Sequence, residues 1–294
     1  MARDRLIEAL AQEFPGALQE AGGHALFLPR SEDELSEALR IATRIGAPLS
    51  SPGGDHRDES VIVDLRRMAD LLAFDATSHL AHIEAGCPVA ELEATLVGRG
   101  LTLGLASAPD ESIGTWLANG AAGARDRSSD PVDQLVAGLS AVLADGRRLH
   151  IRPAPRRAAG PDLIAAFIGG RGRLGVITSV HLVARPATDI APVVFRFDEQ
   201  DDATAALAWM RGRGVRPVRS EIRVESDDSA MLALQLDGPE RLREVKSAVA
   251  RRVASEHGGV PVDQGPAPRG AAPIPHSESI DALGAALDPS RILG

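Results

Sequence analysis

The stretch Ser112-Ile-Gly-Thr-Trp-Leu-Ala-Asn-Gly-Ala-Ala-Gly123 decides the fold of this 294-residue chain. Its glycines allow the backbone to approach a ligand closely, and successive free N–H groups form nests that bind anions. Ser112 stands where a helix N-terminus is expected, which is another position that favours a phosphate. Two further segments, at residues 51–56 and 169–175, are also rich in glycine. Each segment alone is more typical of an ordinary turn, so the argument depends on their combination.

The segment Gly170-Arg-Gly-Arg-Leu-Gly175 matches G-x-G-x-x-G, the pattern of dinucleotide-binding folds. That pattern needs a strand before the glycines and a helix after them, so that a phosphate meets the helix N-terminus. Here the order is reversed, because residues 161–168 predict a helix and the β-branched run at 176–180 predicts a strand. We therefore interpret the motif as a turn between a helix and a strand, facing a cofactor, and not as a Rossmann site.

Outside these segments, hydrophobic periodicity predicts short strands and helices that alternate along the chain. Ser31-x-x-Glu34 is a capping box that opens one helix, and Asp145-Gly146 is a hairpin signal. After Pro186 the pattern becomes β-α-β-β-α-β, the order of a ferredoxin-like module, with Asp198 as the expected cap of its first helix. The expected helices are 1–14, 31–46, 88–98, 161–168, 198–211, 239–258 and a short one before 287; the expected strands are 25–28, 61–65, 79–84, 136–143, 148–152, 176–180, 193–197, 218–224, 231–236 and 260–262. This interleaving predicts the α+β fold class.

Four stretches, in this order, resemble the FAD-binding domain of the vanillyl-alcohol-oxidase (PCMH-type) flavoproteins. They are Val61-Ile-Val-Asp-Leu-Arg-Arg-Met68, His82-Ile-Glu-Ala-Gly-Cys-Pro88, residues 112–123, and Gly160-Pro-Asp-Leu163 followed by Gly169-Gly-Arg-Gly-Arg-Leu-Gly-Val-Ile-Thr178. The tail Leu287-Asp-Pro-Ser-Arg-Ile-Leu293 is similar to the closing segment of that family. The branch that the chain resembles most holds alkyldihydroxyacetonephosphate synthase, D-lactate dehydrogenases and the FAD subunits of glycolate oxidase.

The resemblance covers residues 25–186 and implies the domain organisation. A two-lobed PCMH-type FAD-binding domain is expected at residues 1–190, and a small ferredoxin-like cap that carries substrate specificity at 191–265. Residues 266–294 would be a linker and a C-terminal segment that returns to the first domain.

The resemblance also implies which residues contact FAD. The loop at 52–56 would lie against the pyrophosphate, residues 119–122 would lie near the flavin, and residues 171–177 would supply backbone contacts. Arg223 matches the position whose arginine faces the substrate in the synthase, so it is the candidate substrate anchor. The positions expected to contact FAD are Pro52, Gly53, Gly54, Asp55, His56, Ser107, Pro109, Asp110, Ser112, Ile113, Gly114, Thr115, Asn119, Gly120, Ala121, Gly123, Arg171, Gly172, Leu174, Gly175, Val176 and Ile177.

The first loop departs from the family pattern. Asp55 and His56 follow Gly54 where the family usually has Thr or Ser, and the loop is short. A carboxylate beside a pyrophosphate costs Coulomb energy unless it is paired, and Arg57 is the neighbouring candidate for that pair. His56 stands one place late for a covalent bond to the flavin, so we expect FAD to bind non-covalently. The chain also has no tyrosine, which removes a phenol as acid or base.

Composition disfavours several other classes of function. The 41 acidic residues exceed the 32 basic ones and give a net charge of −9, which disfavours nucleic acids and anionic membranes as partners. Cys87 is the only cysteine, so no disulfide framework and no Cys-based metal site is expected. His79 and His82 are three residues apart on a predicted strand and so point to opposite faces, which disfavours a metal pair. No 18-residue apolar run and no apolar signal core occurs, so the expected location is cytoplasmic.

Two functions from different classes stay open at this point. The first is an FAD-dependent oxidoreductase in which the flavin accepts a hydride from a small substrate such as a 2-hydroxy acid. The second is a non-catalytic or partner subunit with a degenerate flavin site, similar to a relative of the glycolate oxidase FAD subunit. The short loop, the small cap and the missing tyrosine favour the second function, and a homo-oligomer is compatible with both.

Overall fold

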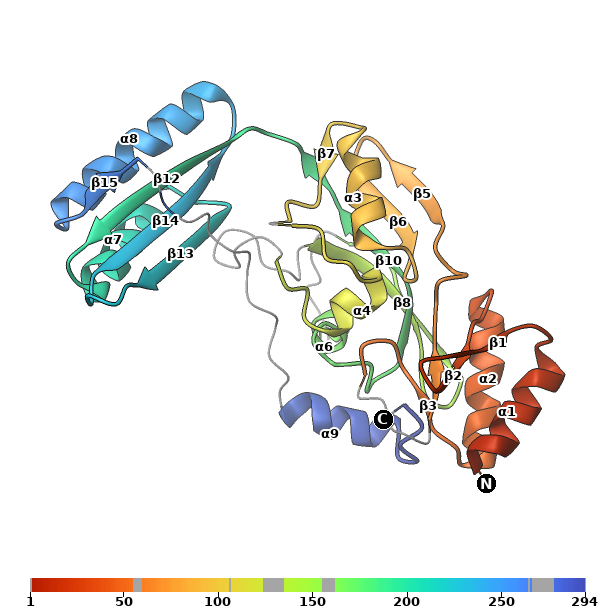
Figure 1. Ribbon diagram of the computed structural model, residues 1–294. Helices are drawn as coiled ribbons and strands as arrows, with labels where there is room; N and C mark the ends of the chain where they lie inside the picture. Colours follow the sequence, from red (N-terminus) through yellow and green to blue (C-terminus); the bar gives the residue numbers. More distant parts are fainter. Residues whose placement is uncertain are drawn as a thin grey trace.

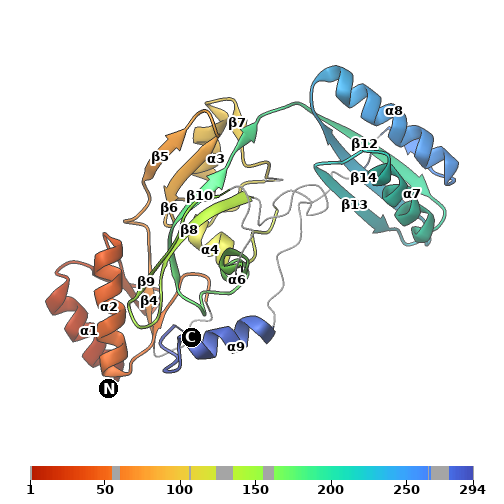
Figure 2. The same cartoon turned by 180° about the vertical axis from the view of Figure 1, so that it is seen from behind.

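The computed structural model describes residues 2–54, 60–105, 107–123, 135–154, 162–263, 265 and 278–293. They form two bodies, each with its own hydrophobic core (Figures 1 and 2). The first body holds the described residues up to 187 together with 278–293, and the second body holds residues 190–263.

The N-terminal layer of the first body pairs two helices with a small sheet of order β1-β2-β4-β3. Helix α2 begins after Ser31, whose side chain accepts the N–H of Glu34, and it ends at Gly46 in the left-handed conformation. Glu34 accepts the N–H of Arg30 rather than that of Ser31, so only half of the expected capping box forms. The elements are α1 (Ala2–Glu13), β1 (Leu18–Ala21), β2 (His24–Phe27), α2 (Glu32–Ile45), β3 (Leu49–Ser50) and β4 (Val61–Val63).

A five-stranded antiparallel sheet of order β5-β6-β10-β8-β9 forms the rest of the first body. Helices α3, α4 and α6 lie on one face of this sheet in both views (Figures 1 and 2). Trp116 of α4 is fully buried. The elements are β5 (Leu71–Asp75), β6 (Leu80–Glu84), α3 (Val89–Val97), β7 (Leu101–Thr102), α4 (Ile113–Ala118), β8 (Val136–Val142), β9 (Arg148–Ile151), α6 (Leu163–Phe167), β10 (Val176–Val183) and β11 (Arg185–Pro186), which pairs with β7.

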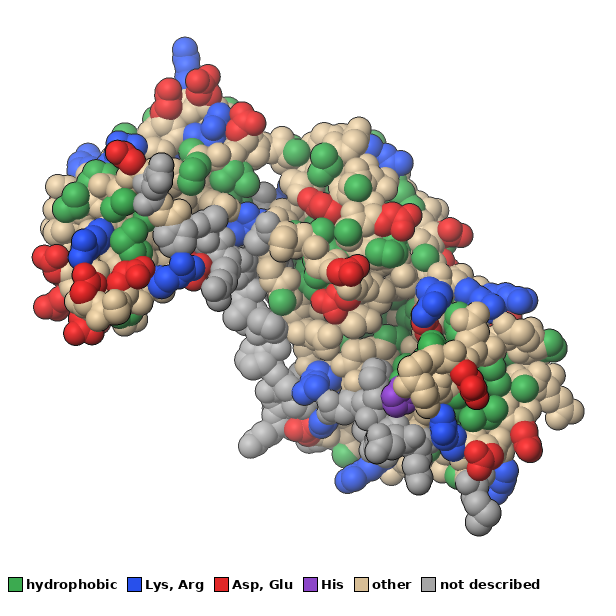
Figure 3. All heavy atoms as spheres, in the orientation of Figure 1, with side chains coloured by type: hydrophobic (Ala, Val, Ile, Leu, Met, Phe, Trp, Pro, Cys, Tyr) green, Lys and Arg blue, Asp and Glu red, His purple; other side chains and the backbone are tan. Residues whose placement is uncertain are grey.

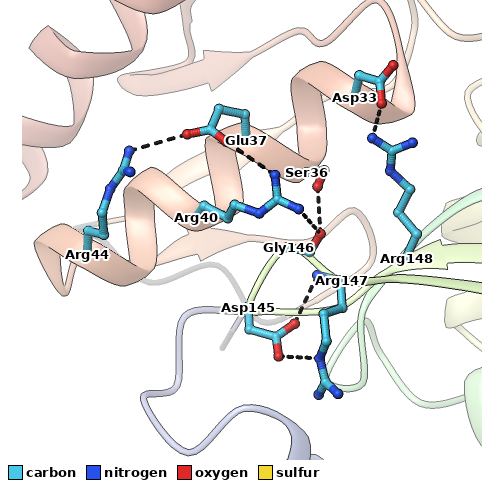
Figure 4. A network of polar contacts seen from close by, with 9 residues as sticks. All are labelled: Asp33, Ser36, Glu37, Arg40, Arg44, Asp145, Gly146, Arg147 and Arg148. Carbon is cyan, nitrogen blue, oxygen red and sulfur yellow. Dashed lines mark hydrogen bonds and ion pairs between the residues drawn. The ribbon is translucent and has the colours of Figure 1, made fainter.

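A polar network joins the turn of the β8–β9 hairpin to α2 (Figure 4). The carbonyl of Gly146 accepts hydrogen bonds from the Ser36 hydroxyl at 2.6 Å and the Arg40 guanidinium at 3.4 Å. A Cβ at Gly146 would lie 2.6 Å from the Ser36 carbonyl oxygen, and its φ is +80°. Only glycine fits this turn, which fixes the sheet against the N-terminal layer.

The second body is a four-stranded sheet of order β13-β14-β12-β15 with α7 and α8 on one face. Its core includes Phe195, Phe197 and Met210, all of them fully buried or nearly so. Glu199, not Asp198, is the N-cap of α7, and its side chain makes no capping bond; that prediction was wrong. Pro239 precedes α8 as expected. The elements are β12 (Ile190–Phe197), α7 (Gln200–Gly212), β13 (Arg219–Val224), β14 (Ala230–Asp237), α8 (Glu240–Glu256) and β15 (Val260–Val262).

The C-terminal segment packs on the first body. Helix α9 (Glu278–Leu287) carries Asp281, which forms an ion pair with Arg173. After α9 the buried carboxylate of Asp288 accepts the N–H groups of Ile292 and Leu293, each at 2.8 Å. The carbonyl of Ile292 in turn accepts the N–H of Leu49, at the start of β3. The tail is thus hydrogen-bonded to the strand that leads into the first glycine segment.

No helix in the described residues is both long and apolar enough to cross a bilayer. In the same part of the chain, no three His, Cys, Asp or Glu side chains are grouped so that they could hold a metal ion.

Candidate functional site

The three glycine-rich segments meet at one narrow cleft of the first body, whose free space for a water-sized molecule is only about 10 Å³. Its lining comes from the end of β3, from α4 and from the turn between α6 and β10, and no lining side chain carries a charge. Apolar walls with a few convergent polar groups are typical of cofactor pockets. The lining residues are Ser51, Pro52, Gly114, Ala118, Phe167, Gly170, Gly172, Leu174, Gly175 and Ile177.

The first segment leaves β3 and turns back on itself, with the N–H of Gly54 donating to the carbonyl of Ser51. Gly53 has a φ of +75°, and a Cβ there would lie 3.2 Å from Asn119 Oδ1 and 3.3 Å from the Thr115 carbonyl oxygen. The glycine is therefore what lets this loop lie against α4. Asp55 and His56, both expected at the pyrophosphate, lie outside the described residues.

The second segment is the start of α4. Ser112 is its N-cap, and its Oγ accepts the N–H of Thr115 while it also bonds the Thr115 hydroxyl at 2.9 Å. Gly114 donates its N–H to the Ala85 carbonyl, and a Cβ on Gly114 would lie only 3.0 Å from the Ala85 Cβ. The helix start is thus held by capping and by close packing on the end of β6.

The third segment is a turn between α6 and β10, so a helix precedes it and a strand follows it, as predicted. The N–H groups of Gly169 and Arg171 donate to the carbonyls of Leu117 and Ala118 at the end of α4. Gly172 has a φ of +74°, and a Cβ there would lie 2.2 Å from the Ser51 Oγ. The third segment therefore packs on both of the others.

Backbone donors remain available at this junction. Within the described residues, the N–H groups of Gly53, Gly172, Leu174 and Gly175 donate to no protein acceptor. Unpaired N–H groups beside glycines that allow close approach form the kind of nest that holds phosphate oxygens. The residues present therefore fit a ligand that combines apolar rings with a phosphate group.

Two titratable side chains near the site have shifted pKa values. The sequence analysis did not single out the first, Glu111, and it gave the second, Cys87, no role in a site. Glu111 directly precedes Ser112, and burial raises the pKa of its carboxyl. The amide of Asn119 points to the same carboxylate at 3.5 Å, and no pattern in the sequence signals this pair. Burial raises the pKa of the Cys87 thiol to about 11, so this cysteine is not a reactive thiolate.

The structure brings some of the expected contact residues into the cleft and leaves others beside it. Those in the lining are Pro52, Gly114, Gly172, Leu174, Gly175 and Ile177. Those in the same three segments, but outside the lining, are Gly53, Gly54, Ser112, Ile113, Thr115, Asn119, Gly120, Ala121, Gly123, Arg171 and Val176. Ser107, Pro109 and Asp110 precede α4 in an irregular loop.

Arg223 lies on β13 of the second body, where its guanidinium donates to Glu221 at 2.9 Å. Arg219, on the same face of β13, is buried and donates at 2.6 Å to the carbonyl of Gly104 in the first body. The arginine that reaches across to the first body is therefore Arg219, which the sequence did not distinguish from Arg223.

Comparisons with known proteins agree with this geometry. Residues 24–152 match the family described as FAD binding domain. Over 125 residues the chain is 35% identical to the uncharacterized FAD-linked oxidoreductase YgcU of Escherichia coli K12, a match that covers 42% of this chain. Over 204 residues it is 26% identical to the mitochondrial D-lactate dehydrogenase (cytochrome) 1 of Saccharomyces cerevisiae, a match that covers 65% of this chain. The chain spans only 26% and 35% of the lengths of these two relatives.

Among solved structures, alkyldihydroxyacetonephosphate synthase superposes on 89% of this chain with a TM-score of 0.72 at 17% identity, and 62% of the synthase is covered. At this identity the likeness concerns the fold alone.

Proposed function

We propose that this chain is a PCMH-type FAD-linked oxidase that binds FAD non-covalently across the three glycine segments and acts as an oxidoreductase on a small substrate, as its matches to the FAD binding domain and to a D-lactate dehydrogenase support. When bound, the flavin supplies the hydride acceptor. The chain supplies the orientation of both molecules and the exclusion of water.

The observation that carries the proposal is the uncharged cleft where the three glycine segments meet, whose lining includes Gly172, Leu174 and Gly175 with unpaired N–H groups. Each such donor contributes about 1 kcal/mol when it binds an uncharged acceptor and about twice that for a charged oxygen. The contact residues proposed for FAD are the expected positions in these three segments. Asp55 follows Gly54 in the sequence, and a carboxylate beside a pyrophosphate costs Coulomb energy, so we expect weaker binding than in larger relatives.

We assign the second body to the substrate. In this assignment residues 1–190 are the FAD-binding domain, residues 191–265 are a ferredoxin-like cap, and residues 266–294 return to the first domain. The similarity to a D-lactate dehydrogenase supports a 2-hydroxy acid as the substrate class. Arg223 is the proposed anchor of the substrate carboxylate, which would replace Glu221 as the partner of its guanidinium. The proposed location of the protein is cytoplasmic.

FAD titration of the purified protein, followed by flavin fluorescence, tests the proposal. Gly172→Ala is the decisive variant because its Cβ would lie 2.2 Å from the Ser51 Oγ. Gly100→Ala is the matched control, since Gly100 has a φ of +73° but no atom within 4 Å of its added Cβ. We expect Gly172→Ala to lose FAD and Gly100→Ala to keep wild-type affinity. If the wild type does not bind FAD at about 100 μM, its binding free energy is weaker than about 5.5 kcal/mol, and the proposal is refuted.

One observation favours the second function, a partner subunit with a weakened site. The pair between Arg223 and Glu221 neutralises the proposed anchor, and its side chains are only 35% and 23% exposed. Protein that binds FAD, but whose flavin no 2-hydroxy acid bleaches under anaerobic conditions, would support this function over the first.

A further inference from the structure

Helix α8 lies on the outer side of the second body, away from α4 and α6 in both views (Figures 1 and 2). A groove of about 440 Å³ runs along its exposed flank. Hydrophobic, acidic and basic side chains intermingle on the surface of the second body that carries α8 (Figure 3). The groove is lined by Ala191, Glu240, Arg243, Glu244, Ser247, Ala248 and Arg251.

The charges along this groove follow a fixed order. Glu240 and Glu244 lie in the N-terminal half of α8, and Arg251 lies in the C-terminal half. All three are exposed, and none of them forms an ion pair within the described residues. Arg243 is different, because it already bonds Asp189 and the carbonyl of Gly238. The groove therefore offers both signs of unpaired charge, separated along one helix.

Small and apolar residues separate the two signs of charge. Ser247 and Ala248 lie midway between Glu244 and Arg251, and Ala248 is exposed. Val245, one turn before Ala248 on the exposed side, is 59% exposed. Acidic residues near the N-terminus of α8 and a basic residue near its C-terminus are favoured by the helix dipole alone. The dipole does not explain why the apolar side chains of Val245 and Ala248 are exposed between them.

From these observations we propose that two copies of this chain pair through α8 as antiparallel helices about a two-fold axis. In an antiparallel pair centred between Ser247 and Ala248, Glu244 of each copy faces Arg251 of the other. The charged contact therefore occurs twice. Small residues at the crossing point allow helix axes to approach to about 8 Å, and Val245 becomes covered. The surface is self-complementary, as a two-fold interface requires.

One helix pair is a small interface, so we expect a reversible dimer with a Kd on the order of 10 μM. Sedimentation equilibrium of the full chain up to about 100 μM measures it. Glu244→Arg places two arginines in contact in each half of the interface, and Arg251→Glu places two glutamates there. Each single variant is therefore expected to be monomeric throughout this range.

The exchange of charges makes the test specific. An equal mixture of Glu244→Arg and Arg251→Glu restores opposite charges at both contacts, so it is expected to dimerise, and so is the double variant. Arg216→Glu is the control, because Arg216 is exposed on the loop between α7 and β13, outside the groove. It changes the net charge as Arg251→Glu does, and we expect it to dimerise like the wild type.

Circular dichroism verifies that each variant is folded. A monomeric wild type at about 100 μM would overturn the proposal. So would single variants that still dimerise, or a mixture that stays monomeric although both of its components are folded.

Discussion

Acidification is expected to destabilise this protein through a pair of stacked histidines. His82 of β6 and His181 of β10 are direct cross-strand partners, and their rings stack at 3.9 Å with an interplanar angle of 8°. His82 Nε2 also lies 3.2 Å from the Ser179 hydroxyl. Burial, followed by repulsion from His82 and then His150, lowers the pKa of His181 to about 4. Burial also lowers the pKa of His82.

The direction of the effect follows from the order of the two pKa values of His181. The unfolded chain binds a proton near pH 6.5, and the folded chain only near pH 4. Between these values the unfolded state holds more protons, so stability is complete above pH 6.5 and falls as the pH drops toward 4. Between about pH 7.5 and 5 the upper bound on this loss is about 2 kcal/mol. Since the ring keeps some contact with solvent, we expect roughly 1 kcal/mol.

Urea unfolding at several pH values between about 7.5 and 5 measures this loss. His181→Gln removes the titrating ring, so its unfolding free energy should fall with pH by roughly 1 kcal/mol less than that of the wild type. His79→Asn is the control, because His79 is outside the stack and has a φ of +53°, a conformation that asparagine tolerates. It should keep the wild-type pH dependence. An identical pH dependence in His181→Gln and the wild type would refute the reasoning.

Two further predictions concern the tail and the second body. Asp288→Ala leaves the N–H groups of Ile292 and Leu293 without their acceptor and should lower the unfolding free energy by about 2–4 kcal/mol in urea; a change below about 0.5 kcal/mol would show that water replaces the carboxylate. Arg223→Ala should leave the FAD affinity unchanged and slow flavin reduction by a 2-hydroxy acid, in stopped-flow absorbance under anaerobic conditions. An equal loss of FAD in that variant would show instead that Arg223 is structural.

The sequence by itself determined most of the longer helices and strands and the family of the fold, but not the short strands β1, β3, β5, β7 and β11, nor the extent of α4. Two examples of elements that it did determine come from the apolar residues at helical spacing after Ser31 and from the β-branched run at 176–180. Both are local patterns, so residues close in the sequence are enough to favour the helix and the strand. The order of helix, glycine turn and strand around 169–175 was likewise readable, and it excluded a Rossmann site. The cap of α7 was not readable, because Asp198 and Glu199 are adjacent acids and the observed cap makes no side-chain bond that would distinguish them.

Only the tertiary structure decided which distant residues meet. The sequence disfavoured a pair of His79 and His82 on one strand but gave no partner for His82. The strand β6 begins only at Leu80, and the partner of His82 is His181, because the sheet order places β6 beside β10. Arg219 and Arg223 share one face of β13, and the packing of the second body against the first selects Arg219 to reach Gly104. Gly172 needs to be glycine because Ser51 lies against it. Such contacts depend on strand order and on how the layers pack, and these follow from burying surfaces far apart in the chain rather than from any local pattern.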